Sequence, residues 1–273
     1  MNNTVLRSLT GSLFVALVVF SALYGTPYLI MFFALVLVFG THEVIRLLED
    51  RGGIYSLWVW VSNLVLFSLV SLHELYEFRS ELLWLGALPI VVLFCFQLFQ
   101  TPSERNSFAL QNSLLAIAYI TIPLVLSIVL SSSNPLLVLA IFIMLWSNDT
   151  MAFLIGKWLG KNKLFERLSP KKTIEGFVGG LLGSLVSSVI LSMYHHEINL
   201  VFWMVLSIVV SVAGTLGDLF ESMLKRNAGV KDSGNVIPGH GGVLDRLDSF
   251  LFAAPFVFFC TVLFHAIGVL HSV

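Results

Sequence analysis

Acidic and basic side chains gather near the C-terminal end of the chain, with hydrophobic runs on both sides of them. On a helix, Asp218, Ser222 and Lys225 would lie within about 60° of one another on a single face. Arg226 follows directly and makes the cation a pair. Carboxylate oxygens beside paired cations suit a site that holds a hard cation such as Mg²⁺ together with phosphate groups. The alternative is an interfacial Lys-Arg pair with an acid that neutralises its charge.

A glycine-rich segment follows and leads into two further acids. Its sequence is Pro238-Gly239-His240-Gly241-Gly242. Glycine lets backbone N–H groups approach an anion closely, and the start of a helix adds its own positive end. Asp245 and Asp248 stand three positions apart where the next hydrophobic run begins. We therefore predict that Asp218 and Asp245, on neighbouring helices, hold metal ions that bind a triphosphate.

The composition places these residues in a membrane protein. Of 273 residues, 57% are hydrophobic and 11% charged, and the mean hydropathy is +0.92, which excludes a soluble globular domain. Apolar runs of the length that crosses a bilayer recur along the chain. They predict an all-α fold with about nine transmembrane helices, at 8–24, 27–45, 54–72, 82–99, 110–130, 135–156, 174–194, 199–224 and 249–270. Nothing in the sequence indicates nucleic-acid binding.

The placement of lysine and arginine predicts how the chain sits in the membrane. With the N-terminus in the cytoplasm, all of the 15 lysines and arginines except Arg79 fall on the cytoplasmic side. The polar loops 157–173 and 225–248 then share that side. We expect residues 1–130 to form scaffold or interface helices and residues 131–273 to form the catalytic region. The N-terminal spans are also candidates for a homodimer interface.

The polar residues of the C-terminal half resemble a known signature. It consists of Ser222-Met223-Leu224-Lys225-Arg226, Lys231-Asp232, the segment 238–242 and Asp245-Arg246-Leu247-Asp248. In residues and spacing it resembles the phosphatidate cytidylyltransferases, also called CDP-diacylglycerol synthases. Asn148-Asp149-Thr150-Met151-Ala152-Phe153 and Ser169-Pro170-Lys171-Lys172-Thr173 also match features of that family. The resemblance covers about 140–260.

The resemblance implies a membrane enzyme that joins CTP to phosphatidic acid and releases CDP-diacylglycerol and pyrophosphate. It implies catalytic roles for Asp149, Asp218, Lys225, Arg226 and Asp245. It implies substrate-binding roles for Ser169, Lys171, Lys172, Thr173, Ser222, Lys231, Asp232, His240, Gly241, Gly242, Arg246 and Asp248. Asp218 and Asp245 would bind Mg²⁺, with room for a second cation. The expected location is a bacterial inner membrane, with the active site on the cytoplasmic side.

Other interpretations remain open. Asp149, Asp218 and Asp245 could line an ion pathway, although carriers generally place such groups at mid-membrane within two similar halves, and no internal symmetry is evident. A CDP-alcohol phosphotransferase would carry a D-G-x₂-A-R run, which is absent here. A relative without catalytic activity is a third candidate. In the N-terminal half, His42 and Glu43 are expected to cap a helix end or pair with Arg46.

Overall fold

The computed structural model describes residues 3–49, 55–100, 104–239 and 241–268. Its elements are α1 (Asn3–Tyr24), α2 (Thr26–Glu49), α3 (Ser56–Tyr76), the 3₁₀ helix η1 (Ser80–Ala87), α4 (Leu88–Leu98), α5 (Glu104–Ser133), α6 (Pro135–Leu159), β1 (Lys163–Phe165), β2 (Ser169–Thr173), α7 (Ile174–Tyr194), α8 (Leu200–Asn227) and α9 (Leu244–Ala266). Apart from the short β1–β2 pair, this is the all-α fold that the sequence predicts.

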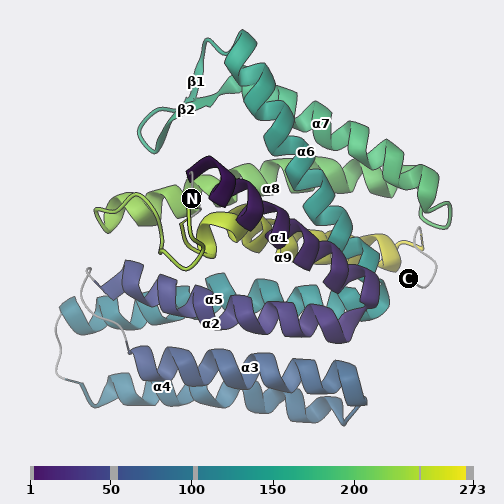
Figure 1. Cartoon of the computed structure of the whole chain (residues 1–273). Coiled ribbons are helices and arrows are strands. Elements are labelled where there is room, and N and C mark those ends of the chain that lie inside the picture. The colour runs from purple at the N-terminus through teal and green to yellow at the C-terminus, as the bar shows by residue number, and fades with distance from the viewer. Residues whose placement is uncertain (1–2, 50–54, 101–103, 240, 269–273) are drawn as a thin grey trace. The chain divides into compact units, whose positions relative to one another are not determined.

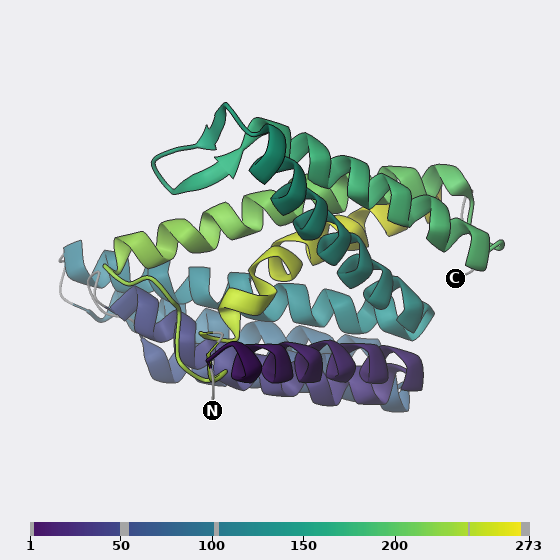
Figure 2. The same cartoon turned by 45° about the horizontal axis from the view of Figure 1, so that its top comes forward.

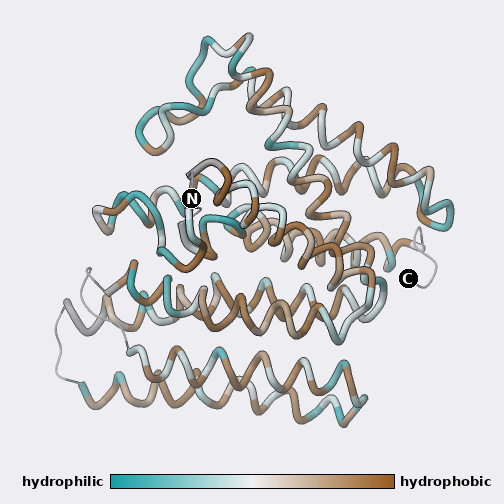
Figure 3. The backbone as a smooth tube through the Cα atoms, viewed as in Figure 1, coloured by the Kyte–Doolittle hydropathy of each residue, from teal (hydrophilic) through white to brown (hydrophobic). Residues whose placement is uncertain are grey.

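The apolar helices account for the membrane prediction. Within the described ranges, eight helical segments are long and apolar enough to cross a bilayer, from Thr26–Leu48 to Leu244–Ala266. The apolar part of α1, Ser8–Tyr24, is shorter than these. Coloured by hydropathy, the helices are mostly hydrophobic and the β1–β2 hairpin is hydrophilic (Figure 3). The chain is a multi-pass membrane protein.

The chain divides into two compact units, which we describe separately. Unit 1 comprises Met1–Ser132 and Leu224–Leu247, and unit 2 comprises Ser133–Met223 and Asp248–Val273. The segment that links α8 to α9 therefore packs with the N-terminal helices. Helices α8 and α9 each contribute residues to both units.

In unit 1, α3 and α4 form one layer and α2 and α5 form the next (Figure 1). A buried hydrogen-bonded triad ties three of these helices together. The Asn63 amide nitrogen donates to the Thr41 hydroxyl at 2.9 Å, and the Thr121 hydroxyl donates to the Asn63 amide oxygen at 2.7 Å. All three side chains are almost fully shielded. In an apolar core such bonds fix which faces of the helices meet.

In unit 2, α6 and α7 pack closely because small residues line their contact. A Cβ atom on Gly180 would lie 2.6 Å from the Asn148 amide oxygen, and one on Gly183 would lie 2.6 Å from Met151 Cγ. Between these helices the chain forms the antiparallel β1–β2 hairpin, with Lys163 paired to Thr173. Figure 2 shows this hairpin beyond the ends of α6 and α7.

The helix ends differ from the predicted boundaries at the polar loops. Helix α8 continues to Asn227 and α9 begins at Leu244, so the predicted loop 225–248 is shorter by three residues at its start and by five at its end. Asp245 and Asp248 consequently lie in the first turns of α9. The predicted loop 157–173 contains the end of α6 and the hairpin, because backbone pairing satisfies N–H and C=O groups that an open loop would leave to water.

Candidate active site

A pocket of about 400 Å³ opens in unit 2 among α6, the hairpin, α7 and α8. Its charged lining residues are Asp149, Lys157, Lys171, Lys172 and Asp218. Phe153, Leu164 and Phe177 supply an apolar part of its wall. A pocket with this lining offers charged groups for phosphates and carbon surface for a hydrocarbon chain. Five of the predicted site residues line it together: Asp149, Lys171, Lys172, Thr173 and Asp218.

The closest charged contact in this pocket joins Lys172 to Asp218. The Lys172 ammonium nitrogen lies 2.7 Å from a carboxylate oxygen of Asp218, and their side chains remain 28% and 37% exposed. The Ser222 hydroxyl donates to the other oxygen of Asp218 over a longer 3.4 Å. Ion pairs of this exposure contribute little to stability. Both groups therefore remain accessible to a ligand.

Two acceptors at the start of α7 hold the hairpin in place. The Thr173 hydroxyl accepts a hydrogen bond from the Gly176 N–H at 3.1 Å and caps the helix. The Glu175 carboxylate accepts from the backbone N–H groups of Lys161 at 3.0 Å and Asn162 at 3.2 Å. Lys171 and Lys172 lie on β2, which pairs with β1 and ends at Thr173. The same bonds therefore fix the strand that carries both lysines.

Asn148 orders the α6 side of the pocket. The Ser211 hydroxyl donates to its buried amide oxygen at 2.6 Å. Its amide nitrogen lies 3.4 Å from a carboxylate oxygen of Asp149, which is a long hydrogen bond. Asp149 itself is exposed. It lies within α6, ten positions before the end of that helix.

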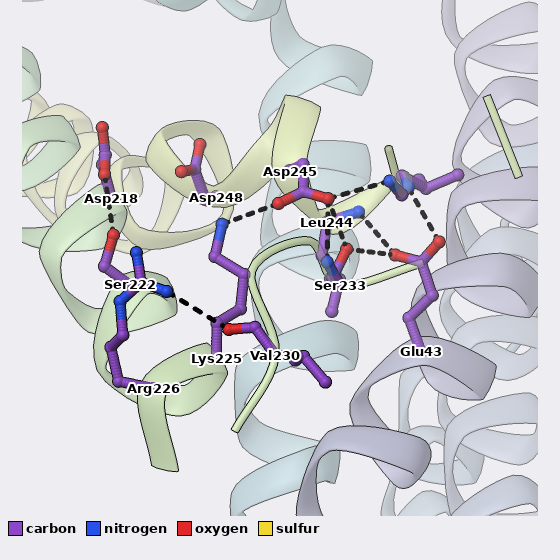
Figure 4. Close-up of polar contacts among 12 residues, drawn as sticks. Glu43, Asp218, Ser222, Lys225, Arg226, Val230, Ser233, Leu244, Asp245 and Asp248 are labelled. Carbon is purple, nitrogen blue, oxygen red and sulfur yellow. Dashed lines mark hydrogen bonds and ion pairs between the residues drawn. The ribbon is translucent and has the colours of Figure 1, made fainter. Parts of the chain in front are cut away.

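In unit 1, Asp245 is the centre of a second polar cluster (Figure 4). One of its oxygens accepts from the Lys225 ammonium at 2.6 Å. The other accepts from the Ser233 N–H at 2.9 Å and the Gly242 N–H at 2.8 Å, and the Ser233 hydroxyl oxygen lies 3.0 Å from it. The side chains of Asp245 and Lys225 are only 8% and 13% exposed. These donors fix the orientation of the carboxylate at the beginning of α9.

Two glycines of the predicted motif are required by close approach. Gly241 has a φ of +88°, and a Cβ there would lie 2.6 Å from an Asp245 carboxylate oxygen. A Cβ on Gly242 would lie 2.6 Å from the carboxyl carbon of Glu43 and would overlap the Ser233 hydroxyl. The glycines therefore let the backbone close around two carboxylates, and Gly242 directs its N–H at one of them.

Glu43 is the residue that the sequence interpretation undervalued. It is 1% exposed, and its carboxylate accepts from the backbone N–H groups of Val243 and Leu244, each at 2.9 Å. It does cap a helix end, as expected, but that of α9 rather than of its own helix. The Ser233 hydroxyl, at 2.9 Å, is its third donor. An acid within an apolar run indicates such a buried role. Its partner could not be identified from the sequence, because it lies 200 positions away.

Further predicted residues lie in α8, on the segment after it, in α9 and in β2. Lys231 and Asp232 are exposed on the segment after α8, and Asp232 lines a small pocket of about 140 Å³ with Arg46 and Asn235. Arg226 is exposed at the end of α8, and its guanidinium lies 3.4 Å from the Val230 carbonyl. Arg246 is exposed in α9, where Asp248 accepts a hydrogen bond from the Ser249 N–H at 2.6 Å. Ser169 is half-buried at the start of β2. His240 lies outside the described residues.

Comparison with known proteins decides the family. Residues 5–264 match the sequence profile described as the Cytidylyltransferase family. The chain belongs to this family. A phosphatidate cytidylyltransferase of Staphylococcus haemolyticus is 37% identical over 201 residues, which cover 72% of this chain and 69% of that protein. One of Bacillus subtilis is 49% identical over 123 residues, covering 45% of this chain and 46% of the relative.

A third relative, from Staphylococcus aureus strain COL, carries the same name and is 42% identical over 160 residues, with 57% and 61% of the two chains covered. The predicted family is thereby confirmed, and so is the prediction that the chain is an enzyme that transfers nucleotidyl groups. A transporter and a CDP-alcohol phosphotransferase, the alternatives from the sequence, are not supported. The individual roles of the site residues stay predictions.

Proposed function

We propose that this enzyme transfers the cytidylyl group of CTP to phosphatidic acid and gives CDP-diacylglycerol and pyrophosphate for phospholipid synthesis. Membership of the family and the shared name of the relatives support the reaction. The observation that carries the proposal is the pocket of unit 2, where Lys171, Lys172 and Asp218 meet an apolar wall. A lipid phosphate has the same two parts, an anionic head and a hydrocarbon body.

The chemistry that this pocket has to perform is the approach of two anions. An oxygen of the lipid phosphate attacks the α-phosphorus of CTP, a new P–O bond forms, and the bond to the bridging oxygen of the β-phosphate breaks. Pyrophosphate departs with the electron pair of that bond. The attacking oxygen already carries negative charge, so the step needs no base to activate it. Lys171 and Lys172 would hold phosphate oxygens and offset their charge, which is catalysis by positioning and electrostatics.

The acids of the pocket fit a magnesium ion. Mg²⁺ usually takes one or two carboxylates together with water and substrate phosphates. Asp218 and Asp149 both line the pocket and offer that donor set. When bound, the cation would neutralise charge on the triphosphate. At Asp245, the other predicted ligand, a cation has to compete with Lys225 for the oxygen that now accepts its hydrogen bond.

We infer the setting of the enzyme from its charges. The lysines of the hairpin and the cations at the end of α8 belong on the cytoplasmic side by the positive-inside rule, where CTP is available. The bacterial relatives support an inner-membrane location. The N-terminal helices are where we place a homodimer interface. Cysteine accessibility to an impermeant thiol reagent, with Cys95 and Cys260 replaced by alanine and single cysteines introduced at positions 166 and 197, tests this topology.

A comparison of acceptor lipids tests the reaction. Purified enzyme in micelles receives CTP labelled at the α-phosphate, Mg²⁺ and one lipid at a time: phosphatidic acid, diacylglycerol or phosphatidylglycerol. We expect label in the lipid phase with phosphatidic acid alone, because only its phosphate monoester gives the pyrophosphate-linked product. Transfer to diacylglycerol at a similar rate, or none to phosphatidic acid, would overturn the proposal.

A further inference from the structure

The Glu43 carboxylate is enclosed by the segment that precedes α9. Besides its three hydrogen bonds, it is packed between two glycines: a Cβ on Gly234 would lie 2.8 Å from the Glu43 carboxyl carbon, and one on Gly242 would lie 2.6 Å from it. Both glycines and Ser233 are buried. The backbone therefore closes around the acid and excludes water from it. An acid enclosed in this way cannot itself bind a substrate.

A continuous chain of hydrogen bonds runs from this acid to the Lys225–Asp245 pair (Figure 4). Ser233 is the link, because its hydroxyl donates to a Glu43 oxygen at 2.9 Å and its backbone N–H donates to an Asp245 oxygen at 2.9 Å. A second path runs through the backbone: Glu43 accepts the N–H of Val243, and Asp245 accepts the N–H of the neighbouring Gly242. Glu43 and Asp245 thus hold the same short segment from its two sides.

A negative charge is well suited to this position. The first N–H groups of a helix have no partner within the helix, and the helix dipole is positive there. From a different helix, α2, Glu43 supplies both acceptor oxygens to the N–H groups of Leu244, the first residue of α9, and of Val243 directly before it. The start of α9, where Asp245 stands, is therefore fixed by an N-terminal helix.

We propose that Glu43 is a positioning residue for the transfer reaction, which acts through Ser233 and the 242–244 backbone to hold Asp245 and Lys225 in their reactive arrangement. This inference rests on the proposed function, in which Asp245 and Lys225 contact the metal or the phosphates. It assigns a catalytic consequence to the N-terminal half of the chain, where no site residue was predicted. Glu43 itself touches no substrate.

The variant Glu43→Gln tests this with little change of volume. The amide nitrogen of the glutamine would face a backbone N–H group, so one cap bond is lost and two donors point at each other. Charge-assisted hydrogen bonds of this kind are worth roughly a 10- to 100-fold effect. We expect kcat at saturating CTP and lipid to fall about 10-fold or more. Amide hydrogen exchange, followed by mass spectrometry on the full-length protein in micelles, should speed up at Val243 and Leu244 to a similar extent.

Thr41→Val is the matched control. It removes an equally buried hydrogen bond from the same helix, two positions away, but that bond leads to Asn63 rather than to the α9 segment. We expect it to lower the melting temperature while kcat and exchange at 243–244 stay within about twofold of the wild type. A merely stabilising role for Glu43 would produce the same pattern in Glu43→Gln, and that result would overturn the proposal.

A double-mutant cycle with Ser233→Ala separates action through Ser233 from a general loss. If Glu43 acts through Ser233, the double variant loses little more activity than the worse single variant, whereas additive losses contradict the proposal. Should Glu43→Gln fail to accumulate, Ser233→Ala alone must lower kcat and speed exchange at 242–244, and unchanged values would overturn the inference. A wild-type protein without transferase activity would instead refute the proposed function, while the exchange data would still test whether Glu43 holds the segment.

Discussion

The Lys172 ammonium lies 2.7 Å from the Asp218 carboxylate and joins β2 to α8 across the pocket of unit 2. The pair brings opposite charges to an accessible surface rather than to a sealed core. A substrate phosphate can therefore engage Lys172 while a cation engages Asp218.

Replacement of Lys172 by methionine removes the charge and keeps most of the side-chain volume. We expect transfer activity to fall about 10- to 100-fold, which is the range for a charge-assisted contact to phosphate. Lys161→Met is the control, because that side chain is exposed directly before the hairpin and does not line the pocket. Steady-state kinetics in micelles measure both. Equal losses in the two variants would indicate a general effect of positive charge near the membrane.

Replacement of Asp149 by asparagine tests the acidic part of the pocket. The change keeps the shape and removes one carboxylate from the donor set. We expect activity to fall at least about 10-fold and the Mg²⁺ concentration for half-maximal rate to rise, since a hard cation prefers charged oxygen ligands. Glu166→Gln, at an exposed acid of the hairpin turn, serves as the control in the same Mg²⁺ titration. An unchanged Mg²⁺ requirement in Asp149→Asn would remove Asp149 from the cation site.

Two glycines allow the cost of backbone strain to be compared with the cost of a steric collision. Gly241 and Gly229 both have positive φ, but a Cβ on Gly229 meets nothing within 4 Å. Gly229→Ala should cost roughly 1 kcal/mol of stability and leave activity intact. Gly241→Ala adds a collision with Asp245, so we expect a larger drop in melting temperature and a loss of activity. Thermal unfolding in detergent, with the activity of the folded fraction, checks this. Similar behaviour of the two variants would contradict the packing described here.

The buried triad of unit 1 should matter for stability alone. Thr121→Val removes the donor to the Asn63 amide oxygen while it keeps the side-chain volume. Interhelical hydrogen bonds in membrane proteins average about 0.6 kcal/mol and reach about 1–2 kcal/mol, so we expect a loss in this range. Denaturation in mixed micelles measures it. Activity of the folded protein should be unchanged, and a loss of kcat would show that this core is coupled to the site.

The sequence predicted the helices well because hydropathy over about 20 residues is a local property. That Asp218 and Lys225 lie near one face of α8 could likewise be predicted, because helix geometry alone sets it. Contacts between segments that are distant in the sequence could not be predicted in this way. Lys172 could be assigned to phosphate from its motif, but its pairing with Asp218 depends on how the hairpin folds onto the pocket.

The hairpin and Glu43 show the limits of local patterns most clearly. The strand β2, Ser169–Thr173, carries charges without the alternation of a half-buried strand, and its pairing is stabilised by anchors such as Glu175 at the start of α7. Near the end of α2, Glu43 looked like a partner of Arg46 in sequence. Only the folded chain brings the N–H groups of Val243 and Leu244 to it.

The most direct test of the central claim follows the two ends of CTP separately in one assay. Enzyme in micelles with phosphatidic acid and Mg²⁺ receives CTP labelled either at the α- or at the γ-phosphate, and the variant Asp218→Asn is run beside the wild type. We predict that α-label enters the lipid, γ-label leaves as pyrophosphate in equal amount, and both stop with EDTA or in Asp218→Asn. Transfer of γ-label to the lipid, or normal transfer by folded Asp218→Asn, would contradict the account.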